Sequence, residues 1–385
     1  MLDKARLAYA EELSRVGNPS ALHKSGRLAR AVVEDARERM AKAVGAHPTE
    51  IIWLSGGTEA DNIAIKGLYW ARNSADPRRT RIITTAIEHH AGLDPALYLE
   101  QEHGATAVVL PVDAEGRIDL DVLRAEVAEH FDEIAMINVM WANNEVGTIQ
   151  PIQDVVNIAA EHDIPVHADA VQAFGHVPID FKTTGLASMA ISAHKLGGPV
   201  GVGVLVARRD LEITPLTHGG LQERKVRSGT LNAAGFHAAS IAAEEAVETL
   251  EAEANRLRAL QIDLIERVRK AIPEAKLSGP EPGDDRLPNN CHFVFPGCAA
   301  EAMMFVLDSH GVEASNGSAC SAGVAQASHV LLAMGRNKVD AASTMRFSLG
   351  HTSTKADVDA LLEHLPEAVA KAKRVSGDFK SEVFG

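Results

Sequence analysis

Residues 189–206 read MAISAHKLGGPVGVGVLV, two short apolar runs joined by a turn that carries Lys195. The runs MAISA (189–193) and VGVLV (202–206) are too short for helices, and their length and composition favour buried strands. Glycine and proline at 197–199 favour a turn between them. This stretch therefore predicts two strands of a buried sheet, with a lysine where the chain leaves the first strand.

Apolar runs of the same kind recur through the first 210 residues. They are IIWL (51–54), RIITT (81–85), TAVVL (106–110), IAMINVM (134–140) and PVHA (165–168). Segments with helical spacing lie between many of them, for example Leu28, Val32, Val33, Ala36 and Met40. This alternation predicts an α/β sheet that is mostly parallel and covered on both faces.

A second domain is expected beyond residue 250. From about His237 to Ile272, a pattern rich in Ala, Glu and Leu predicts one long helix ending near Pro273. It is followed by the runs CHFVF (291–295), VEAS (312–315) and TMRFSL (344–349), and by helical stretches around 299–309, 325–334 and 355–371. We expect a large α/β domain with an N-terminal helical segment over residues 1–250, and a smaller α+β domain over 251–385.

Composition limits the function classes. The 385 residues carry a formal net charge of -14, which opposes phosphate backbones and anionic membrane surfaces, so we expect no direct nucleic-acid or membrane partner. Neither an export signal nor an apolar run of membrane-spanning length is recognised. The three cysteines fit neither a disulfide framework nor a four-ligand zinc site. We therefore expect a cytoplasmic protein without a metal site.

Lys195 is a candidate for covalent cofactor binding. It stands at the edge of the predicted sheet where ligands collect in open α/β folds. An amine becomes nucleophilic at neutral pH when desolvation or nearby cations lower its pKa, and His194 is a candidate neighbour. A lone lysine in a glycine-rich turn is more often an ordinary surface residue, so this interpretation depends on other segments.

Three further segments point to the same cofactor chemistry. Residues 55–58 (SGGT) lie between a strand and a helix, where backbone N–H groups can bind a phosphate. Asp169 ends a strand and can pair with a protonated pyridine nitrogen, although a strand-end Asp is as often a helix N-cap. His89 also follows a strand and can stack on a ring and pass protons, although a single histidine is more often a bystander. Together with Lys195 they indicate pyridoxal phosphate (PLP).

Four more motifs make a family resemblance specific: NNEVGT (143–148), RSGT (227–230), SACS (318–321) and RFSLG (346–350). With the segments above, they follow the order and spacing of the fold-type I PLP-dependent transferases. The sequence resembles the class V subgroup known as cysteine desulfurases, of the iron-sulfur-cluster and nitrogen-fixation type. The resemblance extends from GNP at 17–19 to about residue 370.

The resemblance implies a role for each matching residue. Lys195 would carry the cofactor as a Schiff base, and His89 would stack on its ring. Asn144 and Arg346 would bind the substrate carboxylate, which suits an amide and a guanidinium fork. The remaining cofactor contacts would come from Asp169 at the pyridine nitrogen, Gln172 at the ring hydroxyl, and Gly57, Thr58, Ser192 and His194 at the phosphate, joined by Thr230 from the second subunit of a homodimer.

Cys320 is the expected sulfur acceptor. It lies in SNGSACSAG (315–323), whose small residues are typical of an exposed loop. The resemblance implies that its thiolate takes sulfur from L-cysteine as a persulfide and leaves alanine. Cys291 and Cys298 are expected to be buried apolar residues instead. The stretch from Cys320 to Leu331 is as long as in the family group that passes sulfur directly to acceptors. We therefore expect activity without an activating protein, and acceptor partners such as an iron-sulfur scaffold or a tRNA-thiolating enzyme.

The sequence departs from the family in two places. Residues 219–223 read GGLQE where relatives have GGGQE, which changes the backbone freedom near the expected dimer contact. Relatives also usually open with a strand and turn of the form YLDxAATTP, and this sequence starts just downstream of it, which we expect to affect activity more than fold. The alternatives on the same fold are a selenocysteine lyase, a small-substrate class V aminotransferase and a non-catalytic relative.

Overall fold

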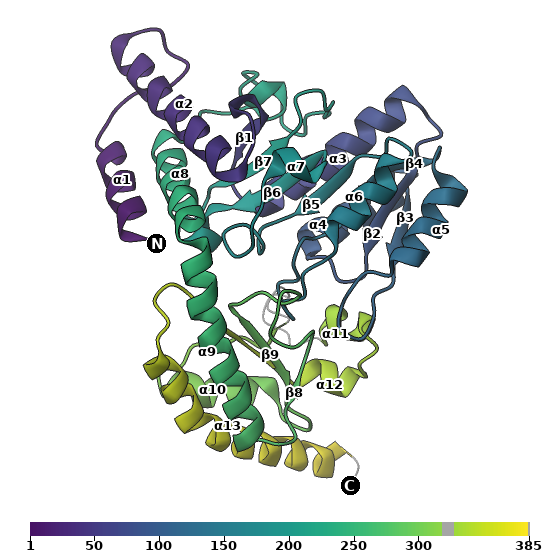
Figure 1. Ribbon diagram of the computed structural model, residues 1–385, viewed down its shortest axis with the longest axis vertical. Helices are drawn as coiled ribbons and strands as arrows, with labels where there is room; N and C mark the ends of the chain where they lie inside the picture. The colour runs from purple at the N-terminus through teal and green to yellow at the C-terminus, as the bar shows by residue number, and fades with distance from the viewer. Residues whose placement is uncertain (318–326, 384–385) are drawn as a thin grey trace. The chain divides into compact units, whose positions relative to one another are not determined.

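A computed structural model describes residues 1–317 and 327–383, with the side chains from 376 onward left out, and divides the chain into two compact units (Figure 1). The first comprises Met1–Leu110, Asp119–Trp141 and Pro151–Leu250, and the second comprises Pro111–Ile118, Ala142–Gln150 and Glu251–Gly385. Both short segments lie within residues 1–250, which the sequence predicts to be the first domain. The structure groups them with the second because residues of 142–150 pair with its backbone, as in the Ile149 N–H that donates to the Asp285 carbonyl at 2.9 Å.

Within the described residues, the first unit is built on one sheet of seven strands in the order β1-β7-β6-β5-β4-β2-β3. The strands are β1 (Ile51–Leu54), β2 (Arg81–Thr85), β3 (Thr106–Leu110), β4 (Ile134–Asn138), β5 (Val166–Asp169), β6 (Ser188–Ser192) and β7 (Gly203–Ala207). The β6-β5-β4-β2-β3 part is parallel, and β7 is antiparallel to both of its neighbours, β1 and β6. The predicted mostly parallel α/β sheet is confirmed.

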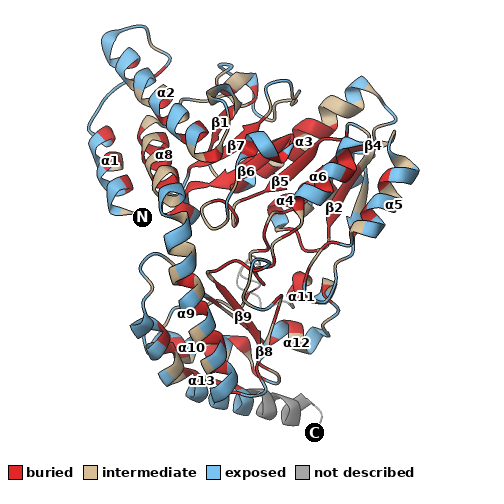
Figure 2. Ribbon diagram, in the orientation of Figure 1, coloured by how far each residue is buried: buried red, intermediate tan, exposed pale blue. Residues whose placement is uncertain are grey.

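Burial explains why the central strands show no polar alternation. Strands β4, β5, β6 and β7 are buried along their whole length (Figure 2). A sheet covered on both faces needs apolar residues on both sides of each strand. The edge strand β3 is exposed or half-buried except at Leu110.

Helices cover both faces of this sheet. They are α1 (Asp3–Leu13), α2 (Lys24–Val44), α3 (Gly57–Ala75), α4 (His90–His103), α5 (Leu120–His130), α6 (Ile152–Ala160), α7 (Phe181–Thr184) and α8 (Ala233–Glu248). Helix α3 crosses strands β4 to β7 and packs against α4, while α6 packs against β5, α5 and α7 (Figure 1). Helix α8 packs against α1 and α2.

The second unit combines a small antiparallel sheet with helices. The sheet has the order β10-β9-β8, from β8 (Lys276–Leu277), β9 (Asn290–Val294) and β10 (Thr344–Ser348). The helices are α9 (Leu250–Ala271), α10 (Ala300–Ser309), α11 (His329–Ala333), α12 (Lys338–Ala342) and α13 (Lys355–Val383). Their core includes Phe293, Phe295, Met303, Leu307 and Leu365.

Two predicted elements differ in the structure. The helix expected from His237 to Ile272 is two helices, because Thr249 leaves helical geometry at φ -101° and ψ 0° and its hydroxyl donates to the Glu245 carbonyl at 2.8 Å. The strand expected at 312–315 is reduced to one bridge between Ser315 and Arg346.

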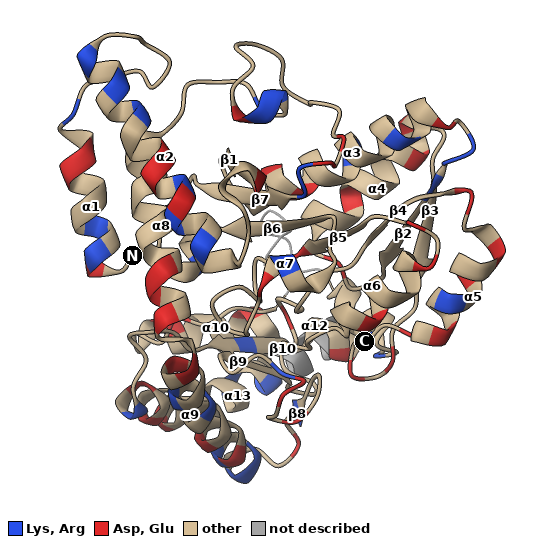
Figure 3. Ribbon diagram, turned by 45° about the horizontal axis from the view of Figure 1, so that its top comes forward, with Lys and Arg blue, Asp and Glu red and all other residues tan. Residues whose placement is uncertain are grey.

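Charges of both signs are interspersed along the helix surfaces, for example on α9 (Figure 3). Of the helices in the described ranges, none has the length and apolar character needed to span a membrane.

Candidate cofactor and substrate sites

The predicted cofactor residues of the first unit follow strands that end at one edge of the sheet. Strands β1 and β6 are both antiparallel to β7, so they run in the same direction as each other and as β5 and β2. Residues 55–58 follow β1, His89 follows β2, Asp169 ends β5, and Lys195 follows β6. Carboxyl ends of parallel strands form the edge where α/β folds bind ligands.

Asp169 is a buried acid at this edge, with 6% of its surface exposed. Its Oδ1 accepts the Val171 N–H at 2.8 Å, while no described residue donates a hydrogen bond to its Oδ2. Burial, followed by the charge of Asp61, raises the pKa of Asp169 to about 8, although the Val171 N–H and the charges of His167 and Lys195 oppose the rise. A cation placed beside Oδ2 would restore the ionised form.

The buried polar groups around Asp169 carry no sequence motif that predicts them. His167 on β5 is fully buried, and its Nε2 lies 3.2 Å from Asp61 Oδ1 on α3. Burial lowers the pKa of His167 to about 4 and raises the pKa of Asp61 to about 8. Glu88 accepts hydrogen bonds from the Thr85 hydroxyl at 2.6 Å and the Met140 N–H at 2.9 Å.

Burial also raises the pKa of Glu88 to about 8, and the charges of Asp169 and Asp61 add to this rise. Three buried carboxyl groups thus share one region of the first unit. Such a cluster is costly unless protons or a bound cation neutralise it.

The turn after β1 leads directly into helix α3. A Cβ atom on Gly57 would lie 2.6 Å from Val171 Cγ2, so only glycine fits there. The first N–H groups of a helix have no acceptor within the helix and can bind an anion. Ser192, at the end of β6, is buried, and its Cβ would lie 3.5 Å from the same added atom. The structure therefore brings Gly57 and Ser192 together, and their role in phosphate binding stays a prediction.

An ion pair ties this turn to the RSGT motif. Glu59 accepts hydrogen bonds from the Ser55 N–H at 2.6 Å, the Ser55 hydroxyl at 2.7 Å and Arg227 Nε at 3.0 Å. Although burial opposes it, these hydrogen bonds and the charge of Arg227 lower the pKa of Glu59. Thr230, three residues beyond Arg227, is exposed.

The GGLQE departure has a visible backbone consequence. Leu221 adopts φ 60°, in the left-handed region that glycine reaches without a steric penalty, and 64% of its surface is exposed. A leucine there carries strain that the glycine of relatives does not. The next residues are anchored, since Glu223 accepts Arg37 Nη2 at 2.7 Å and the Trp53 N–H at 2.8 Å.

The other predicted cofactor residues also lie on this unit. Lys195 and His194 are on the short 3-10 helix η2 (Ala193–Leu196), and both are exposed. Partial desolvation of the His194 ring, followed by the charge of Lys195, lowers the pKa of His194.

His89 is the N-cap of α4, where its Nδ1 accepts the Ala91 N–H at 3.0 Å. The Nε2 atom of a neutral His89 therefore carries the proton. Gln172 is half-buried and Thr58 is exposed.

The two predicted substrate residues meet in the second unit. Arg346 is half-buried on β10, and its Nη1 donates to the Asn144 carbonyl at 2.9 Å. Backbone hydrogen bonds join Arg346 to Ser315 in both directions, at 2.6 and 3.2 Å. The turn that carries Asn144 is held by Asn143, whose Oδ1 accepts the N–H groups of Glu145 and Val146 at 2.9 Å each. The guanidinium and the amide-bearing residue therefore lie side by side on fixed backbone.

Buried hydrogen bonds hold this turn in place. Glu145 is 4% exposed and accepts the Ser328 hydroxyl at 2.5 Å, while its carbonyl accepts Asn290 Nδ2 at 2.8 Å. Gly147 adopts φ 80°, and a Cβ atom there would lie 2.9 Å from Asn290. The NNEVGT motif thus needs its glycine both for backbone geometry and for space.

His292 was not recognised from the sequence. It is fully buried on β9, where it pairs in register with Arg346. Burial, followed by the charges of Arg286 and Arg346, lowers the pKa of His292 to about 3. Gly317 has φ 80°, and a Cβ atom there would lie 2.7 Å from His292 Nε2. The neutral ring therefore packs against the backbone just before residue 318.

Two cysteines are buried, as expected. Burial raises the pKa of Cys291 to about 12, despite the charge of Arg286, and burial also raises the pKa of Cys298. Protonated buried thiols are poor nucleophiles. Cys320, the expected sulfur acceptor, lies outside the described residues.

Comparison with known proteins adds the family. Residues 1–361 match the family model for aminotransferase class-V. The IscS-like cysteine desulfurase of Mycobacterium tuberculosis is 50% identical over 371 residues, which cover 96% of this chain and 93% of that protein. The cysteine desulfurase NifS of Azotobacter vinelandii is 40% identical over 361 residues, covering 94% and 87%. A solved NifS-like protein is 33% identical with a TM-score of 0.87, covering 96% of both chains. The chain therefore belongs to the aminotransferase class-V family, on the branch of the IscS- and NifS-type cysteine desulfurases.

Proposed function

We propose that this protein is a PLP-dependent cysteine desulfurase that converts L-cysteine to L-alanine and transfers the sulfur to Cys320 as a persulfide. The observation that carries the proposal is the placement of a buried Asp169 at the end of β5 and of Lys195 just after the neighbouring parallel strand β6. The names of the similar proteins support the same reaction.

The residues of the first unit fit the cofactor. Asp169 is a buried acid that lacks a nearby cation strong enough to keep its pKa at the ordinary value, and a protonated pyridine nitrogen is such a cation. The α3 N-terminus at Gly57, with the buried Ser192 beside it, presents donors suited to a phosphate. His194 and Thr58 are exposed and available to the same group. When bound, PLP supplies an electron sink for the substrate.

Each residue then has one task. Lys195 would bind the cofactor covalently and, once released, move the substrate α-proton with its amine. Gln172 would donate to the ring hydroxyl. His89, whose Nε2 carries a proton in the neutral ring, would stack on the cofactor and donate that proton. Arg346 and Asn144 would hold the substrate carboxylate, which fixes the direction of the substrate's C–S bond.

Sulfur transfer needs a thiolate. The Cys320 thiolate would form an S–S bond with the substrate sulfur as the C–S bond breaks, and the carbon that loses sulfur gains a proton to become the methyl group of alanine. Cys291 and Cys298 are unsuited to this role because burial raises the pKa of both thiols. The persulfide would then pass to an acceptor protein such as an iron-sulfur scaffold or a tRNA-thiolating enzyme.

The active form would be a homodimer. Thr230 would complete the phosphate site of the second subunit, and the Glu59–Arg227 ion pair supports this by fixing the backbone that leads to Thr230.

Reduction of the loaded protein with borohydride tests the cofactor assignment, because it traps a covalent amine linkage. Peptide mapping should find the cofactor on Lys195 in the parent and in the control Lys182→Ala, and no trapped cofactor in Lys195→Ala. A linkage on another lysine of the parent would refute the assignment.

A further inference from the structure

We propose that His310, His364 and Glu367 form a binding site for one divalent transition-metal ion of the zinc class, using side chains that take no part in the proposed desulfurase chemistry. His310 follows the last residue of α10, and His364 and Glu367 lie three residues apart on α13. The nearest potential ligand atoms of the three residues all lie within 4.8 Å of one another. Among the described residues, no other group of histidine, cysteine and acidic side chains meets this condition.

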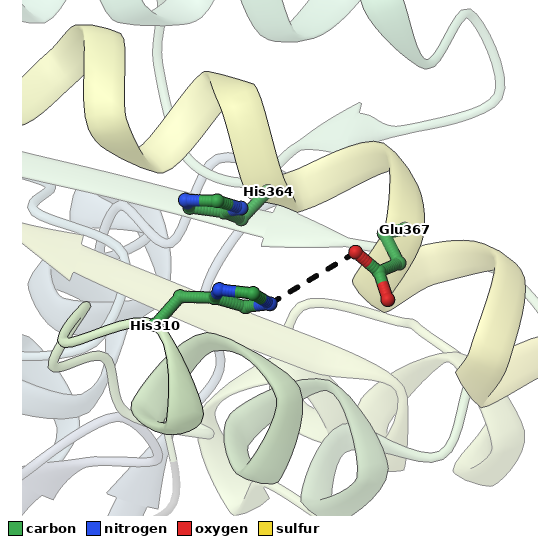
Figure 4. Close-up of side chains that lie close together, drawn as sticks. All are labelled: His310, His364 and Glu367. Atoms are coloured by element: carbon green, nitrogen blue, oxygen red, sulfur yellow. Dashed lines mark ion pairs between the residues drawn. The ribbon is translucent and has the colours of Figure 1, made fainter.

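The potential ligand atoms of the three side chains lie close together. The two imidazole rings are stacked, with centroids 3.9 Å apart and planes inclined by 5°. The Glu367 carboxylate faces the edges of both rings, and its Oε2 lies 3.9 Å from His310 Nε2 (Figure 4). Ligand atoms of a tetrahedral zinc ion stand about 3.4 Å apart, since each lies about 2.0–2.1 Å from the metal. Bringing all three ligand atoms from within 4.8 Å to this spacing requires movements of up to about 1.4 Å, and the two imidazole rings must turn out of their parallel stack so that both lone pairs reach one ion. Rotation of the side chains can supply both changes.

The scaffold beneath these ligands is rigid. Leu307 on α10 and Leu365 and Ala368 on α13 are fully buried in the core of the second unit. These residues fix the two helices against each other, while His364 is half-buried and His310 and Glu367 are exposed. Sites built on helices hold their ligands more precisely than sites on loops, and α13 carries two of the three ligands.

Lys371 orients the carboxylate. Its Nζ lies 2.6 Å from Glu367 Oε1, while Oε2 is the oxygen nearest to His310. Metal-ligating carboxylates are themselves commonly hydrogen-bonded by a neighbouring group, as Glu367 is by Lys371.

The ligand types select the class of metal. Two imidazole nitrogens and one carboxylate oxygen suit zinc, copper or nickel, whereas calcium and magnesium prefer oxygen ligands. Three protein ligands leave a fourth position for water or for a side chain of another molecule.

The test is titration of the PLP-loaded, tag-free protein with Zn²⁺, in a Cys320→Ser background that removes one competing thiol. One equivalent should bind, and His310→Ala, His364→Ala and Glu367→Gln should each weaken binding by about 10-fold or more, the loss reported for weaker changes around metal ligands. His130→Ala is the matched control, since His130 Nδ1 lies 3.6 Å from Glu133, also three residues away, without forming a three-ligand group among the described residues.

Zinc should also raise the melting temperature of the parent but not of His364→Ala. Unfolding without zinc should be the same in parent and variants. Cysteine turnover, measured in proteins that keep Cys320, should also be the same, which separates this site from the desulfurase site. Equal zinc affinity in the parent and in the His310→Ala/His364→Ala double variant would overturn the proposal, and so would an equal loss in His130→Ala. Calcium binding of similar strength would overturn the metal class.

Discussion

Replacing Asp169 by asparagine should have opposite effects on the apo protein and on cofactor binding. The folded-state pKa of Asp169 is about 8, above the value of about 3.9 in an unfolded chain. Between these two values the folded protein holds a proton that the unfolded chain has lost, so its stability falls as the pH rises. The slope is about 1.4 kcal/mol per pH unit for one group, or roughly 2 kcal/mol between pH 6.5 and 8.

Asp169→Asn removes this contribution and also lowers the pKa of Glu88, because the Asp169 charge is one cause of the Glu88 rise. The unfolding free energy of the apo variant should therefore fall less between pH 6.5 and 8 than that of the parent. The buried His167 does not disturb this window, since its folded pKa of about 4 affects stability only below its unfolded value of about 6.5. Urea unfolding of apo protein at several pH values measures the slope.

Cofactor binding should change in the other direction. Asparagine keeps an acceptor for the Val171 N–H but loses the charge that would pair with the ring nitrogen. A hydrogen bond to a charged group is worth about 1.5–3 kcal/mol, which corresponds to about 10- to 150-fold weaker PLP binding. Asp61→Asn is the matched control, because it removes a neighbouring buried carboxyl that has no proposed contact with PLP and should flatten the slope without this loss. Equal PLP affinity in both variants, or an unchanged slope in Asp169→Asn, would refute the reasoning.

Three further outcomes are expected. Cys320→Ala should keep the cofactor spectrum and its response to cysteine but form no persulfide, as mass spectrometry can show; persulfide formation at the parent rate would exclude Cys320. Arg346→Lys keeps the charge but loses the guanidinium fork, so KM for cysteine should rise about 10-fold or more with smaller changes in cofactor affinity; an unchanged KM argues against carboxylate binding. Gly317→Ala places a Cβ atom 2.7 Å from His292 and should lower the free energy of unfolding by about 1–3 kcal/mol more than Gly297→Ala, as urea unfolding can show. Gly297 is the control because it has a similar φ of 74° and open space around it. Equal losses in the two variants would show that the His292 ring moves aside.

The sequence was most informative where function depends on position along a strand. Lys195 and Asp169 could be predicted because each follows or ends an apolar run, and parallel strands bring such ends to one edge. The pairing of Asn144 with Arg346 came from the family resemblance, since the contact joins residues far apart in the chain. Assigned roles for all these side chains stay predictions until they are tested.

Other contacts between distant segments could not be predicted from local sequence pattern. The neighbours Asp61 and His167 lie on a helix and a strand, and no short motif encodes their approach to 3.2 Å. The same holds for His310, just after α10, and His364 on α13, which read as unrelated surface histidines. The break at Thr249 was missed because helical periodicity continues on both sides of it. These features depend on tertiary packing, which overrides local pattern.

The most direct test of the central claim is incubation of the PLP-loaded protein with L-cysteine without reductant, followed by quantification of alanine and mass mapping of all three cysteines. The proposed function predicts alanine and a gain of about 32 Da, the mass of one sulfur atom, on Cys320. A loaded protein that forms no alanine, or one whose adduct turns over on Cys291 or Cys298 instead, would contradict it.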